Sequence, residues 1–200
     1  MMEAVASQDL WIWHACPPGS NNDVNVVMQS PLFLTERNGT APKCPFVVNG
    51  HTYKRGYYFC DGIYPAWSTF VKAFKYPTDP KEKKFKKLQE SARKDVERAF
   101  GVLKQRWGVL IRPLRPYTVA RISKMVYTCV ILHNMILHES GNAISPVHIR
   151  YPPIEPVFDD EALDEIRNEN THFHLRFDLM EHIHAQQLPY LEVDDEGDDN

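Results

Sequence analysis

Two carboxylates, Asp61 and Glu97, occupy positions where they could hold a divalent cation. Asp61 follows the apolar run YYFC and precedes a glycine, which places it at the end of a predicted buried strand. Glu97 lies on a predicted helix, one position from its apolar stripe, and 35 residues stand between the two acids. Hard cations prefer carboxylate oxygens, and two such ions can activate a nucleophile and stabilise the leaving oxygen at a phosphodiester. The pair therefore indicates metal-dependent phosphodiester chemistry if the fold brings the two side chains together.

Each acid also has a purely structural interpretation. Asp-Gly is a favoured turn sequence, so Asp61 could serve only to end the strand. A glutamate on a charged helix is commonly a solvated side chain that pairs with its neighbours. Composition and spacing leave both interpretations open.

Basic residues surround Glu97 and could contact a nucleic-acid backbone; they are Arg93, Lys94, Arg98 and Lys104. Between residues 72 and 115 the chain has 14 Lys or Arg against five Asp or Glu, whereas residues 155–200 have 15 acids against two Arg. This division predicts a polyanion-binding face beside an acidic C-terminal part. The alternative is a solvated helix face with a solubilising tail.

Hydrophobic periodicity predicts the elements that must position these residues. Residues 3–15 alternate like two strands joined by a turn, and residues 53–60 are typical of a short buried strand. Residues 63–74 predict a turn followed by a helix with one apolar face. A clean stripe of apolar residues at steps of three and four predicts one long helix over residues 82–107. Residues 119–137 are apolar around most of a helix, which predicts a core helix.

The chain divides into a domain over residues 1–140, a proline-rich and acidic linker over 141–170, an amphipathic helix over 171–187 and a disordered acidic tail over 188–200. No apolar run approaches the length of a membrane span, so we expect no membrane partner. The four cysteines include no CxxC pair, and the N-terminus lacks the features of a signal peptide, which predicts reduced thiols in an intracellular protein.

Five blocks of sequence occur in a fixed order: MEAVASQDLWIWHA, GSNNDVNV, NGHTYKRGYYFCDGIYPAW, ESARKDVERAFGVLKQRW and MVYTCVILHNMI. Together they resemble the catalytic domain of the PIF/Harbinger transposases and their plant derivatives, over residues 2–139. The resemblance implies an α/β, RNase H-like (retroviral-integrase-like) fold with a DDE triad that binds Mg²⁺ or Mn²⁺. Asp61 matches the second triad aspartate and Glu97 matches the glutamate. Asp23 matches a recurrent family aspartate of less clear role and is kept as a candidate metal ligand.

The sequence departs from the family pattern at its start. In the family, the first triad aspartate lies on the first strand, in a block like IDGTH upstream of EAVASQD, whereas this sequence begins at the equivalent of the second strand. We therefore expect a partial, N-terminally truncated domain that lacks its first strand, the bridging metal ligand and any helix-turn-helix region. Because that aspartate bridges both ions in two-metal catalysis, catalysis is expected to be impaired.

The resemblance implies an ancestral metal-dependent DNA endonuclease and strand-transfer activity, in a nuclear protein with DNA as its partner. The alternative is a domesticated, non-catalytic DNA- or chromatin-associated interaction protein. The resemblance implies that full-length members of the family act with a Myb-like companion protein that supplies DNA binding, so a surface for such a partner could persist after catalysis is lost. A relic without function is the third possibility.

Overall fold

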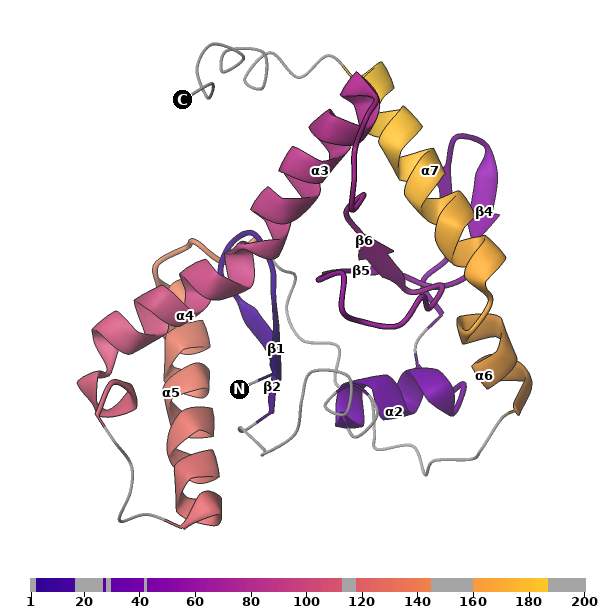
Figure 1. Cartoon of the computed structure of the whole chain (residues 1–200). Coiled ribbons are helices and arrows are strands. Elements are labelled where there is room, and N and C mark those ends of the chain that lie inside the picture. Colours follow the sequence, from indigo (N-terminus) through magenta and orange to yellow (C-terminus); the bar gives the residue numbers. More distant parts are fainter. Residues whose placement is uncertain are drawn as a thin grey trace.

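The computed structural model describes residues 3–16, 27, 30–41, 43–112, 118–144 and 160–186. Asp23 and the tail over residues 188–200 lie outside this part of the chain, as does nearly all of residues 17–29. The described residues form a mixed α/β structure with small two-stranded sheets and several helices (Figure 1). None of the described helices is both long enough and apolar enough to cross a membrane.

The chain begins with the antiparallel hairpin that the sequence predicts. Strand β1 (Glu3–Ala6) pairs with β2 (Ile12–Cys16), from the pair Glu3↔Cys16 to the pair Ala6↔Ile12. Ile12 is buried and the adjacent Trp13 is exposed, which is the alternation of a strand with one face on the core. The sequence pattern therefore identified the hairpin.

A second hairpin joins β3 (Phe46–Val48) to β4 (His51–Tyr53). Its two-residue loop, Asn49–Gly50, has positive φ at both positions, as tight turns between antiparallel strands require. Tyr53 thus belongs to β4, and the strand predicted over residues 53–60 is shorter in the structure. It is β5 (Tyr58–Cys60), which ends directly before Asp61 as expected.

The helix predicted within residues 63–74 is wrong, because this segment contains strand β6 (Phe70–Lys72), parallel to β5. Phe70 and Val71 are consecutive in sequence and both are fully buried. A strand of a parallel pair that is covered on both faces is a continuous apolar run, and periodicity cannot distinguish it from a short buried helix.

The single long helix predicted over residues 82–107 is also wrong. The structure has α3 (Pro80–Arg93) and α4 (Asp95–Arg106), which meet at a bend at Lys94 (Figure 1). No proline or glycine lies at this bend. The two halves pack into different clusters: Phe85 of α3 belongs to a core with residues of β3, β4, β6 and the C-terminal helix, whereas Ala99 and Leu103 of α4 belong to a core with the N-terminal hairpin. We attribute the bend to these two separate packing surfaces.

Helix α5 (Val119–Glu139) follows the short 3₁₀ helix η1 (Gly108–Leu110) and packs on α4 and β2. The Asn134 side-chain amide pairs with both backbone groups of Ile12, at 3.0 Å for the Ile12 N–H and 2.8 Å for its carbonyl. His133, fully buried, bonds the Leu10 carbonyl through Nε2 at 2.9 Å. The predicted core helix is present, but only one of its faces is buried, and several apolar residues on the opposite face are exposed.

The C-terminal part contributes α6 (Asp160–Ile166), within the segment predicted as a linker, and α7 (Glu169–Ala185). A helix in the latter region matches the sequence expectation. Helix α7 lies against α3 and β6 and places Leu175, Leu179 and Met180 in the same cluster as Phe85 (Figure 1). Residues far apart along the chain therefore form one core around β6.

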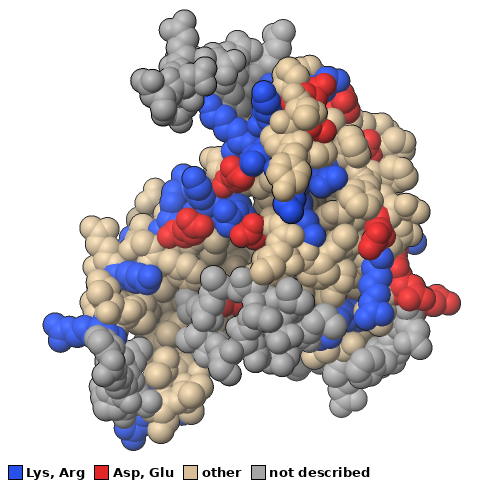
Figure 2. Space-filling view, viewed as in Figure 1, with Lys and Arg blue, Asp and Glu red and all other residues tan. Residues whose placement is uncertain are grey.

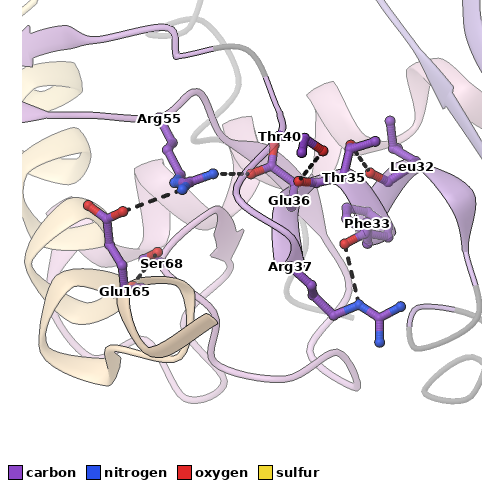
Figure 3. Close-up of polar contacts among 9 residues, drawn as sticks. All are labelled: Leu32, Phe33, Thr35, Glu36, Arg37, Thr40, Arg55, Ser68 and Glu165. Atoms are coloured by element: carbon purple, nitrogen blue, oxygen red, sulfur yellow. Dashed lines mark hydrogen bonds and ion pairs between the residues drawn. The ribbon is translucent and has the colours of Figure 1, made fainter. Parts of the chain in front are cut away.

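An ion-pair cluster ties the remaining helix, α2 (Pro31–Arg37), to α6 (Figure 3). The Arg55 guanidinium lies between two carboxylates, 3.1 Å from Glu36 Oε2 and 3.4 Å from Glu165 Oε2. Burial raises the pKa of Glu36, and the nearby Arg55 opposes that rise. Since Arg55 lies between β4 and β5, this cluster holds α2 and α6 beside the strand that leads to Asp61.

Candidate metal and nucleic-acid site

Asp61 both makes a turn and faces a charged helix. Its Oδ1 accepts a hydrogen bond from the Gly62 N–H at 2.7 Å, and its carbonyl accepts one from the Tyr64 N–H at 3.3 Å. Its other carboxylate oxygen, Oδ2, lies 3.9 Å from Arg93 Nη1 at the end of α3. The structural and the functional interpretations of this aspartate are therefore compatible, because each uses a different oxygen.

Gln89 and Arg93 stand one turn apart on α3, and Glu97, in the first turn of α4 beyond the bend, has Oε1 3.7 Å from Arg93 Nη1, so the three side chains follow one another in a row. Gln89 is buried, and its Nε2 donates to the Cys60 carbonyl at 3.0 Å and to the Val71 carbonyl at 3.1 Å. These two bonds fasten α3 to the end of β5, immediately before Asp61, and to the neighbouring strand β6. The row on the helix is thus fixed relative to the end of the strand.

Arg93 brings the two candidate metal ligands together. Its Nη1 lies 3.9 Å from Asp61 Oδ2 and 3.7 Å from Glu97 Oε1. The two carboxylate oxygens can be no further apart than the sum of those distances. Both acids are solvent-accessible, with side chains 65% and 61% exposed, so the ion pairs contribute little to stability. Two acids distant in sequence therefore lie beside the same arginine on an accessible part of the surface.

The donor set at this point suits a weakly held, largely hydrated cation. Carboxylate oxygens are the ligands that Mg²⁺ and Mn²⁺ prefer, and Mg²⁺ commonly keeps several waters beside one or two carboxylates. Within the described ranges no group of three or more His, Cys, Asp or Glu side chains is placed to hold a metal. Asp23, the third candidate ligand, is outside those ranges. The Arg93 guanidinium also competes for the same two carboxylates.

The basic residues predicted to bind nucleic acid lie beside this point. Lys94 and Arg98 line a shallow hollow together with Ser91 and Glu97, and a second hollow along α3 is lined by further lysines, Lys83, Lys86 and Lys87. Figure 2 shows Lys and Arg gathered over α3 and α4 with acids among them. Arg98 forms an ion pair with Asp95, which neutralises part of its charge.

Lys104, the last of these basic residues, is exposed on α4. It lies seven residues after Glu97, which is about two helical turns, so it faces the same side of the helix. Together with Lys94 it extends the positive surface along the axis of α4.

The thiol of Cys60, which directly precedes Asp61, does not offer alternative chemistry. Burial raises the pKa of the Cys60 thiol to about 12, so this thiol is protonated near neutral pH and is a poor nucleophile or metal ligand. The accessible chemistry at this end of the sheet therefore belongs to the two carboxylates and the basic side chains.

Sequence reasoning missed Gln89 and the bridging position of Arg93. Gln89 lies next to Leu88 in the apolar stripe of the helix, and a polar residue that is buried requires hydrogen-bond partners. A glutamine beside the apolar stripe was therefore the feature of the sequence that could have indicated a buried hydrogen bond. Arg93 was predicted to contact nucleic acid, and its place between two acids depends on how α3 packs against β5, which no local pattern encodes.

Comparison with known proteins identifies the family. A family model described as plant transposon protein matches residues 1–144. No curated protein and no solved structure matches the chain. The matched segment includes both hairpins, the strand that ends at Asp61 and helices α3, α4 and α5. Because the match covers most of its length, the chain belongs to the plant transposon protein family.

Proposed function

We propose that the protein derives from a PIF/Harbinger-type DDE transposase and that Asp61 and Glu97 are metal-binding carboxylates of its ancestral DNA endonuclease and strand-transfer centre. The observation that carries the proposal is the convergence of both carboxylates on Arg93 Nη1. An RNase H-like fold belongs to the same proposal. Its support is an acid at the carboxyl end of a parallel strand, beside a helix that supplies the second acid.

In this proposal each side chain has a defined task. Lys94, Arg98 and Lys104 hold the phosphates of DNA by charge, without reading its sequence. Asp61 and Glu97 hold Mg²⁺ or Mn²⁺, which when bound would assist the nucleophile and the leaving oxygen of the phosphodiester. In hydrolysis a water oxygen bonds to phosphorus and a P–O bond of the backbone breaks. Because no described residue completes a three-ligand group, we expect this chain to cleave DNA poorly.

A nicking assay tests the catalytic part of the proposal. Purified protein is incubated with supercoiled plasmid and with terminal-repeat DNA, in the presence of Mg²⁺ or Mn²⁺, beside an Asp61→Ala variant. We expect cleavage at background level in both samples. Cleavage by the wild type that disappears in Asp61→Ala would overturn the expected impairment and establish an active nuclease.

The alternative function is that of a domesticated, non-catalytic interaction protein in the nucleus, associated with DNA or chromatin and with a Myb-like partner. The guanidinium of Arg93 favours it, because this group lies beside both carboxylates and offsets one of their two negative charges without a metal ion. Binding assays with a Myb-like protein and with DNA separate the two functions. Binding that is unchanged in an Asp61→Asn/Glu97→Gln double variant supports the interaction role, whereas loss of Mn²⁺-dependent DNA binding in that variant supports the metal site.

A further inference from the structure

The outer face of α5 is apolar, continuous and exposed. Val126, Val130 and His133 point into the core, and the opposite side of the helix presents large apolar side chains to solvent. They are Tyr127, Ile131, Leu132, Met135 and Ile136, with exposed fractions between 40% and 59%. Helix α5 lies at the edge of the molecule, with the β1–β2 hairpin on its inner side and α4 packed across one end (Figure 1). Exposed apolar surface of this kind commonly marks a site of protein association.

The sequence of this face is arranged for helix pairing. Lys124, Thr128, Ile131, Met135 and Glu139 follow one another at steps of three and four, so they form a stripe along the exposed side. The stripe begins with a cation and ends with an anion, and its centre is apolar. At about 1.5 Å per residue, Lys124 and Glu139 stand about 22 Å apart, four turns from one another.

This charge pattern is self-complementary. If two copies of the stripe run antiparallel about a two-fold axis between Ile131 and Leu132, Lys124 of each copy lies level with Glu139 of the other. The same operation places Thr128 opposite Met135, and Ile131 opposite Leu132. Within the part of the chain that the structure describes, neither Lys124 nor Glu139 forms an ion pair. Both charges are therefore available to a second copy.

We propose that the outer face of α5 is a self-association surface, on which two copies of this chain pair their α5 helices antiparallel. The contact is isologous, as in most homodimers, because the same stripe serves both copies. One pair of helices with about four turns in contact is at the small end of specific interfaces, so the dimer forms reversibly and depends on protein concentration. Its two end-to-end ion pairs fix the antiparallel direction more than they add affinity.

Sedimentation velocity and light scattering of the full chain test the proposal. The mass of the wild type rises with concentration toward twice the 23.2 kDa of one chain. Ile131→Glu places a charge in the centre of the face and raises the dissociation constant at least tenfold. Val47→Glu is the matched control, because Val47 is equally exposed but lies on β3, and it leaves the constant unchanged. Both positions are exposed, and circular dichroism verifies that the variants fold.

Charge reversal tests the antiparallel direction. Lys124→Glu alone and Glu139→Lys alone each create two like-charge contacts in their own homodimer and weaken it several-fold. An equimolar mixture of the two variants restores both ion pairs in a heterodimer, so it associates more tightly than either variant by itself. A wild type that remains monomeric, a dimer indifferent to Ile131→Glu, or a mixture no tighter than its components would overturn the proposal. A different protein that binds this face of a monomeric chain would also overturn it.

Discussion

Replacing Gln89 with leucine tests how the site is positioned. The leucine side chain is similar in size but removes the amide that donates to the carbonyls of Cys60 and Val71. Each of those bonds contributes about 1 kcal/mol net, and a buried acceptor deprived of its donor costs about 1–3 kcal/mol. Because Gln89 is buried, we expect the free energy of unfolding to fall by about 2–4 kcal/mol. For a domain of this size that corresponds to a melting temperature lower by roughly 4–16 °C.

Urea denaturation followed by tryptophan fluorescence measures this loss. Gln105→Leu is the matched control, because Gln105 is exposed on α4 and the same substitution there should change stability by less than about 0.5 kcal/mol. If Gln89→Leu is as stable as Gln105→Leu, the two hydrogen bonds do not fasten α3 to the strand ends. The explanation of how Glu97 is held near Asp61 would then be refuted.

Three further predictions concern the fold. Burial lowers the pKa of His133 and of His172, so both side chains are neutral in the folded protein near neutral pH. The free energy of unfolding is therefore not reduced by these groups above the unfolded histidine pKa of 6.5. Below pH 6.5 it falls by up to about 1.4 kcal/mol per pH unit for each histidine, because the unfolded chain binds the proton more readily. Urea midpoints at pH 7.5 and 5.5 measure this, and equal midpoints would contradict it. Asn134→Leu removes both bonds to Ile12 and should cost about 2–3 kcal/mol in the same assay; a cost near zero would show that the hairpin is held by apolar packing alone. Asp79→Ala deletes the N-cap of α3 and should cost about 1 kcal/mol, measured as a lower melting temperature; an unchanged value would mean that the cap is dispensable.

The elements predicted correctly from the sequence are those with a local cause. The N-terminal hairpin follows from alternation around Ile12, and α5 and α7 follow from helical periodicity. Strand β6 was mistaken for a helix because Phe70 and Val71 are both buried, which removes the alternation that identifies a strand. The bend at Lys94 was missed because it depends on two separate cores that local sequence does not specify.

The candidate site also combines features that the sequence indicates with features that depend on tertiary packing. The resemblance indicated Asp61 and Glu97 as candidates, and in the structure each has a carboxylate oxygen near Arg93 Nη1, at 3.9 Å and 3.7 Å respectively. The means by which they are held there, Gln89 in the core and Arg93 between the acids, arise only when α3 packs on the ends of two strands. Tertiary packing therefore determines whether a pair of acids distant in sequence becomes a site.

The most direct test of the central claim is a calorimetric titration of the protein with Mn²⁺. We predict weak binding that is lost in Asp61→Asn and in Glu97→Gln, because each removes one of the two carboxylates. Arg93→Gln should bind Mn²⁺ more tightly than the wild type, since it removes the cation that competes for the same oxygens. Binding that is indifferent to the two acid variants, or an Arg93→Gln variant that binds no tighter, would contradict the account.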